Sequence, residues 1–99
     1  MNSAKTTLTT LIFLLSLTAC SVALQPGAEK INLAKSDPAP ECKELGDVKG
    51  SSNFGMENVK NDLRNQALGL GANFVRMETV MNNPKGSLIT MTGTAYACP

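Results

Sequence analysis

Three cysteines are the residues best suited to chemistry in this chain of 99 residues, which contains no histidine. Without an imidazole, the chain lacks the commonest general base, and no Gly-x-Ser-x-Gly elbow or phosphate-binding glycine loop appears. Only Cys42 and Cys98 remain as possible cysteine ligands of a metal once the first cysteine is assigned below, and two thiols alone cannot complete a zinc site. The carboxylates are scattered along the chain. We therefore expect no catalytic residues, no metal site, no cofactor and no small-molecule substrate, so the protein is predicted not to be an enzyme.

The first cysteine directly follows an apolar run over residues 11–19, which is preceded by a positive charge at Lys5. As a helix this run spans roughly 14 Å, against about 30 Å of bilayer hydrocarbon, so it is too short for a permanent span. A short cationic start and an apolar middle are typical of a signal peptide. We predict that residues 1–19 are one.

The residues at the end of that run resemble the lipobox of bacterial lipoproteins: Leu17, Thr18, Ala19 and Cys20. In that class of protein, a diacylglycerol is attached to the cysteine sulfur and a peptidase then cuts just before the cysteine. The resemblance implies that Cys20 becomes the lipidated N-terminus. Two alternatives stay open: ordinary secretion, with cleavage after the Ser-Val-Ala of residues 21–23, or a fortuitous apolar N-terminus on a cytosolic protein.

A lipidated Cys20 would make the membrane the first partner of the protein, because two or more acyl chains anchor a protein stably. Ser21, rather than an aspartate, follows this cysteine. By resemblance to enterobacterial sorting rules, that favours the outer membrane, with the domain facing the periplasm. Removing residues 1–19 leaves 8 Lys+Arg against 8 Asp+Glu. A near-neutral charge argues against a nucleic acid partner.

Cys42 and Cys98 then remain as a pair. Because the periplasm is oxidising, we predict a structural disulfide between them. The two lie far apart in the sequence rather than in a Cys-x-x-Cys turn, which argues against a redox-active pair. Such a disulfide contributes ~4 kcal/mol in the chain-entropy model.

The elements that must position these residues follow from the apolar pattern. A stripe at spacings of three and four predicts one helix: Met56, Val59, Leu63, Ala67 and Leu70. Ser52 or Asn53 is expected to cap its start, and Gly71 to follow its end. Strands are expected at residues 31–34, at 42–50 with a bulge at Gly46, at 73–80 and at 88–98, with a turn at 81–87. Residues 20–30 are expected to form the lipidated cysteine and a short tether, and residues 31–99 a single periplasmic domain.

The predicted disulfide makes the second and last strands antiparallel neighbours, and the turn at 81–87 makes the third and last strands neighbours too. This arrangement is a small α+β domain of split β-α-β type. Its sheet has three to four mostly antiparallel strands, with one helix packed on one face. On the last strand, Gly93, Ala95 and Ala97 would let the helix approach closely. The opposite, wetter face is our candidate partner surface: Thr90, Thr92, Thr94 and Tyr96.

The segment NDLRNQALGLGANFV (residues 61–75), the cysteine before ELGDVKG and the final TAYAC resemble a family of small bacterial lipoproteins, domain of unknown function 4156. The resemblance covers most of residues 42–98. A more distant similarity in fold is to the outer-membrane lipoprotein sensor of the Rcs envelope-stress pathway. That sensor carries two disulfides and a long proline-rich tether, so the similarity implies a shared fold more than a shared role.

These observations predict a lipid-anchored envelope lipoprotein that acts as a non-catalytic binding or envelope-stress-sensing module. Its partner would be an envelope protein or peptidoglycan. The alternative is a periplasmic inhibitor, for example of lysozyme, that inserts the loop at residues 81–87 into an enzyme cleft. Arg64 and Arg76 would mark a partner contact or serve solubility.

Overall fold

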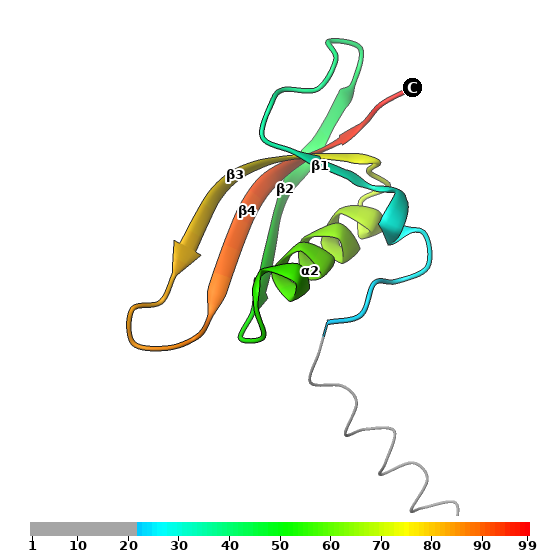
Figure 1. Cartoon of the computed structure of the whole chain (residues 1–99). Helices are drawn as coiled ribbons and strands as arrows, with labels where there is room; N and C mark the ends of the chain where they lie inside the picture. Colours follow the sequence, from blue (N-terminus) through cyan, green and yellow to red (C-terminus); the bar gives the residue numbers. More distant parts are fainter. Residues whose placement is uncertain (1–21) are drawn as a thin grey trace, which may run out of the picture.

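The computed structural model describes residues 22–99 as a four-stranded mixed sheet with one α-helix on one face (Figure 1). The elements are η2 (Ala28–Lys30), β1 (Asn32–Ala34), β2 (Lys43–Ser52), α2 (Met56–Gly69), β3 (Phe74–Asn82) and β4 (Ile89–Ala97). The predicted α+β class is confirmed. The signal peptide, the lipobox and Cys20 lie outside the described residues. Within residues 22–99, no helix is long and apolar enough to cross a membrane.

The strands lie in the order β1-β3-β4-β2, with β4 antiparallel to both of its neighbours. The edge strand β1 pairs with β3 in parallel. Cys42, just before β2, is joined to Cys98, just after β4, by a disulfide with an S–S distance of 2.08 Å. The predicted disulfide and the predicted place of the last strand between the second and third are therefore confirmed.

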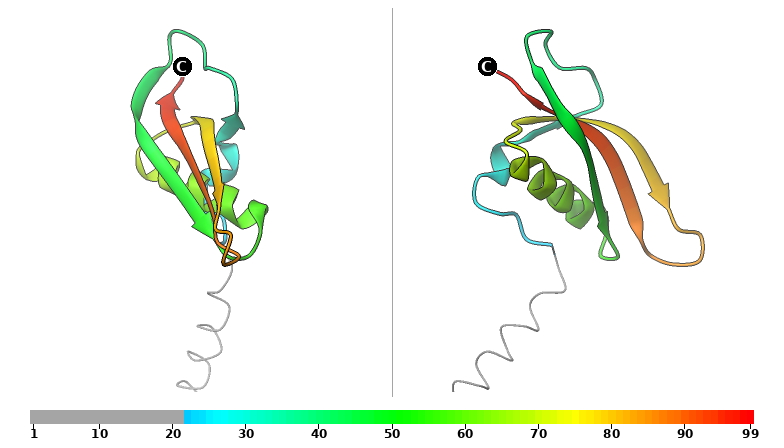
Figure 2. Two further views of the ribbon diagram at one scale, coloured as in Figure 1. Left: turned by 90° about the vertical axis from the view of Figure 1, so that its left-hand side faces the viewer. Right: turned by 180° about the vertical axis from the view of Figure 1, so that it is seen from behind.

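Two irregularities bend the sheet. β2 shifts its register between Glu44 and Gly46, as predicted, and β3 shifts between Met77 and Thr79, which the sequence did not indicate. Bulges increase the twist of the strands that contain them, and the two views of Figure 2 show the resulting curved sheet. The second bulge leaves Glu78 without a partner residue in the β3–β4 register.

The helix α2 buries Val59, Leu63 and Ala67, whereas Met56 and Leu70, at its two ends, are exposed. The prediction that Ser52 or Asn53 caps the start of the helix is wrong. Gly55 precedes the helix, without a side-chain cap, and Ser52 belongs to β2. The Ser52 hydroxyl instead accepts a hydrogen bond from the Phe54 amide and so shapes the turn before the helix. Gly71 follows the helix with φ of 80°, as predicted for a residue past the C-terminus.

The helix approaches the sheet most closely over β2, at Gly50. A Cβ at that position would lie 2.6 Å from both the Val59 carbonyl oxygen and the Leu63 nitrogen. The sequence assigned this role to Gly93 of the last strand, and that assignment is wrong. A Cβ at Gly93 would instead meet the Arg76 carbonyl oxygen of the neighbouring strand at 2.6 Å. The core between helix and sheet contains Ile31, Val48, Val59, Leu63, Ala67, Ala72, Val75, Met91 and Ala95.

Candidate functional site

The segment before η2 is held by asparagines of α2. Asn58 Oδ1 accepts a hydrogen bond from the Val22 amide at 3.0 Å, and Asn61 Nδ2 donates to the Val22 carbonyl at 3.0 Å. Asn65 Nδ2 donates to the Ala23 carbonyl at 2.8 Å, and its Oδ1 accepts from the Gln25 amide at 2.9 Å. A side-chain amide offers a donor and an acceptor, so it can pair with extended backbone as a neighbouring strand would.

Arg64 extends this attachment by donating from Nε to the Ile31 carbonyl at 3.3 Å. The segment of residues 22–31 therefore lies along α2, and the view in Figure 1 shows it beside the helix. The sequence predicted the lipidated cysteine and a short tether over residues 20–30. It did not indicate that residues 22–30 contact the helix, because asparagines that bind another segment and asparagines that face water form the same polar pattern on a helix.

The face of the sheet that points away from α2 carries the candidate partner surface. The register places Thr90, Thr92, Thr94 and Tyr96 of β4 on this face, between side chains of β2 and of β3. We call it the open face, because within residues 22–99 both helices lie on the other side of the sheet (Figure 2).

Half of the predicted surface is less accessible than expected. Thr90 and Thr92 are half-buried, but Thr94 is 5 % exposed and Tyr96 is 8 % exposed. The Thr94 hydroxyl donates to a Glu78 carboxylate oxygen at 2.7 Å. The expectation of a wet face is therefore wrong for these two residues.

Tyr96 is covered by neighbours from β3. The ring of Phe74 meets it edge-on, with centroids 6.2 Å apart, and the Arg76 guanidinium lies 5.9 Å from its centroid. Arg76 also pairs with Asp37 at 2.6 Å and with Glu78 at 3.5 Å. The hydrogen bond to Asp37 raises the pKa of Arg76 above its ordinary value. Arg76 thus fastens the loop before β2 to the open face.

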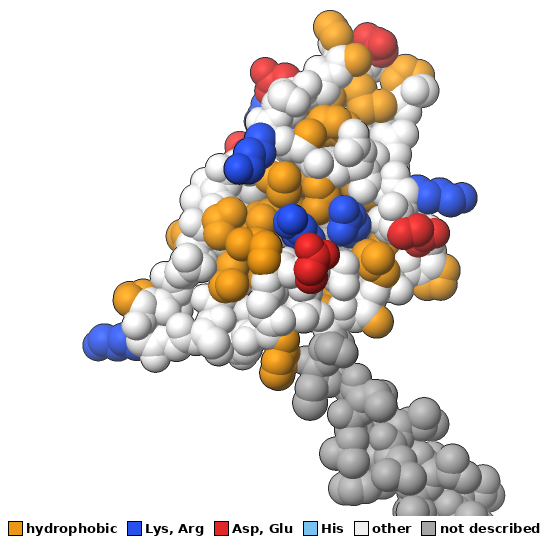
Figure 3. All heavy atoms as spheres, viewed as in Figure 1, with side chains coloured by type: hydrophobic (Ala, Val, Ile, Leu, Met, Phe, Trp, Pro, Cys, Tyr) orange, Lys and Arg blue, Asp and Glu red, His pale blue; other side chains and the backbone are white. Residues whose placement is uncertain are grey.

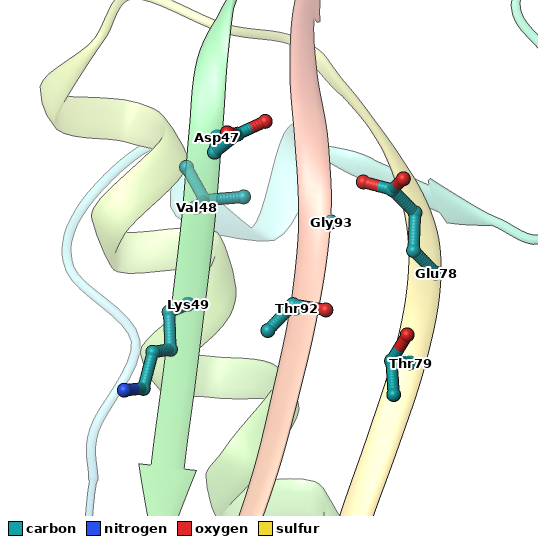
Figure 4. A pocket seen from close by; sticks show the side chains of 7 residues that line it. All are labelled: Asp47, Val48, Lys49, Glu78, Thr79, Thr92 and Gly93. Atoms are coloured by element: carbon teal, nitrogen blue, oxygen red, sulfur yellow. The ribbon is translucent and has the colours of Figure 1, made fainter.

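A shallow depression of about 400 Å³ lies on the open face below this cluster. It is lined by Asp47, Val48, Lys49, Glu78, Thr79, Thr92 and Gly93. Figure 4 shows the Asp47 and Glu78 carboxylates extending toward β4 from opposite sides, whereas the Lys49 side chain points away from β4. We call this feature the sheet depression. Its carboxylates and hydroxyls suit a partner that offers amide, amine or hydroxyl donors.

Sequence reasoning missed Asp47, Lys49, Glu78 and Thr79 as neighbours of Thr92, because they come from two other strands, β2 and β3, and both of these strands contain a register shift. Among the described residues, no group of three or more His, Cys, Asp or Glu side chains is placed to hold a metal ion.

The sequence motif that carried the family resemblance has structural roles. Leu63 and Ala67 are in the core, and Arg64 and Asn65 hold the N-terminal segment. Asn73 makes two hydrogen bonds of 2.8 Å to the backbone of Cys98, beside the disulfide. The segment at residues 61–75 therefore maintains the fold, whereas Asp47, Val48 and Lys49 of the ELGDVKG segment line the sheet depression.

These features define a small α+β domain that is closed by one disulfide and holds its own N-terminal segment along its helix. The sequence model of the family described as "Domain of unknown function (DUF4156)" matches residues 22–98, so the chain belongs to this family. The match begins at Val22, the residue that Asn58 and Asn61 bind. A comparison with curated proteins found no match.

Proposed function

We propose that the protein is a lipid-anchored lipoprotein of the bacterial outer membrane whose periplasmic domain binds a partner without catalysing a reaction. The lipobox resemblance at Leu17–Cys20 supports the anchor. A lipid at Cys20 would join the domain only two positions before Val22. The membrane is thus one partner, and an envelope protein or peptidoglycan is the other.

The observation that carries the binding role is the open face with its sheet depression. Thr92 lies at the centre of it, flanked by Lys49 and Asp47 of β2 and by Thr79 and Glu78 of β3. Two carboxylates and two hydroxyl groups line the depression, and Lys49 borders it on the β2 side with its side chain directed away from β4, a composition suited to a polar interface. Both candidate partners, a protein and peptidoglycan, offer amide and hydroxyl groups to such a surface.

In-cell crosslinking tests this role. A photoreactive residue at Thr92 should give a discrete crosslinked species in intact cells. The matched control is Gln66, an exposed residue of α2, which packs on the other face of the sheet. We expect the crosslink from Thr92 and none from Gln66. Equal yields from the two positions, or no species from Thr92, would remove the support for binding through this face.

A stress-sensing role is the finer form of this proposal, supported by the similarity in fold to the Rcs sensor. It predicts that substituting Thr92 with a large charged residue changes the activity of an envelope-stress reporter in cells. The inhibitor alternative would use the exposed hairpin turn at residues 83–88, which the sequence predicted at 81–87. Addition of the purified protein would then slow lysozyme turnover, whereas a binding or sensing module leaves that turnover unchanged.

A further inference from the structure

Three segments that are distant in the sequence lie at the same end of the molecule: the start of the segment at 22–27, the loop 53–55 and the hairpin turn 83–88 (Figures 1 and 2). The side chain of Asn58 joins two of them. It accepts from the Val22 amide at 3.0 Å and donates to the Phe54 carbonyl at 2.7 Å. The backbones of Phe54 and Val22 are therefore connected through the single side chain of Asn58. We call this region the entry end.

The entry end exposes large apolar side chains. Among the large hydrophobic residues in 22–99, Phe54 is the most exposed at 59 %, and Met81 at 53 % and Val80 at 47 % follow. Met56 and Leu88 are also exposed there, and Leu24 lies on the held segment. Figure 3 shows hydrophobic side chains at this end, over the loop between β2 and α2 and near the hairpin turn. Exposed apolar groups gathered at one end mark an interaction site.

The length of the connection decides what this end contacts. Only Ser21 lies between Cys20 and Val22, and two steps of extended chain span at most ~7 Å. That distance is about the thickness of one headgroup layer of a bilayer. A domain held at Val22 by Asn58 and Asn61 therefore cannot keep the entry end away from the lipid surface to which Cys20 is attached.

We propose that the entry end is a second, non-covalent membrane contact, in which Phe54 inserts into the lipid interface and fixes the orientation of the domain. The proposal rests on the lipid anchor at Cys20 that the proposed function assigns. An apolar side chain contributes to interfacial binding in proportion to the area that it buries. The loop with Asp37 and Glu41 lies at the opposite end of the strands (Figure 1), so the open face stands to the side of the anchor, facing the periplasm.

A single tryptophan can report this contact, because the chain contains none. The full-length protein would be processed in cells, purified with its lipid and reconstituted in phosphatidylglycerol–phosphatidylcholine vesicles with brominated acyl chains. Phe54→Trp should be quenched at least twofold more strongly than the control Glu41→Trp, which places the reporter on an exposed residue at the far end. Equal quenching of the two would overturn the proposal.

Flotation of the same vesicles separates this inference from the anchor. A protein that floats with the vesicles but shows no extra quenching at residue 54 retains its anchor and contradicts the membrane contact. A protein that does not float and lacks lipid at Cys20 contradicts both the lipid anchor and the membrane contact of the entry end. As a second variant, Asn58→Ala with Asn61→Ala removes both contacts to Val22. It should lower the Phe54→Trp quenching toward the control while flotation persists, and undiminished quenching would contradict orientation by these asparagines.

Discussion

The main-chain amide of Val22 donates a hydrogen bond of 3.0 Å to the side chain of Asn58, 36 residues further along the chain. This contact and those of Asn61 and Asn65 make the N-terminal segment part of the folded domain. If Cys20 carries the proposed lipid, the connection from that lipid to the folded domain is short. The family match likewise begins at residue 22, before the first strand.

The asparagine contacts predict a loss of stability when they are removed. Asn65→Ala eliminates hydrogen bonds to Ala23 and Gln25, and a typical net hydrogen bond contributes about 0.5–1.5 kcal/mol. We expect the free energy of unfolding in urea to fall by about 1 kcal/mol and the Gln25 amide to exchange faster with solvent. The control Gln66→Ala removes only a long contact to Asp62. An unchanged exchange rate at Gln25 would show that the segment is not held in solution.

The close approach of α2 to β2 predicts a strong effect at Gly50. The added methyl group of Gly50→Ala meets helix backbone at 2.6 Å, so helix and strand must separate. Overpacking of this kind costs about 1–3 kcal/mol. In the control Gly69→Ala the new Cβ has no neighbouring atom within 4 Å, and it should stabilise the protein slightly through helix propensity. Thermal unfolding of the two variants should shift in opposite directions; a similar shift in both would contradict the packing.

The disulfide predicts a large dependence of stability on redox conditions. Cys42 and Cys98 close a loop with a sequence separation of 56, which corresponds to about 4 kcal/mol in the chain-entropy model. Urea unfolding with and without a reducing agent should therefore give clearly different midpoints. The Cys42→Ser/Cys98→Ser variant should match the reduced protein and lose its sensitivity to the reagent. Identical midpoints for the oxidised and reduced protein would argue against a stabilising disulfide.

The buried hydroxyl of Thr94 predicts a difference between two threonines of one strand. Thr94→Val leaves the Glu78 carboxylate without its donor at 2.7 Å and should cost about 1–2 kcal/mol, since hydrogen bonds to charged groups exceed the neutral average. Thr92→Val, on the same face of the same strand but half-buried, should change stability by less than about 0.5 kcal/mol. Equal losses in the free energy of unfolding of the two variants would show that the Thr94 hydroxyl contributes no more to stability than the Thr92 hydroxyl.

The sequence was sufficient for those parts of the fold that depend on regular spacing. The stripe through Val59, Leu63 and Ala67 located the helix, and pairing Cys42 with Cys98 placed the last strand between its neighbours. It was insufficient where a contact joins residues without a periodic signal. The bulge between Met77 and Thr79 places Glu78 within hydrogen-bond distance of Thr94, and the residue pattern of β3 does not indicate this bulge.

The candidate site was predicted in part for the same reason. Thr92 lies in the sheet depression, as expected for a residue of the outward face, whereas Tyr96 is covered by Phe74 and Arg76 from a different strand. Gly50 lies against the helix backbone and Gly93 against the neighbouring strand, and the sequence contains no signal that distinguishes these two positions. Asn58, Asn61 and Asn65 gave no signal, because a polar helix face is ordinary.

The central claim is that the domain is attached to the membrane by lipid at Cys20, and mass spectrometry of the N-terminal peptide tests it most directly. The protein would be extracted from bacterial envelopes in detergent and digested. We predict an N-terminal peptide that begins at Cys20 and carries the added mass of a diacylglycerol and an amide-linked acyl chain, with both absent from Cys20→Ser. A mature N-terminus at Leu24, or an unmodified Cys20 in an uncleaved chain, would contradict the account.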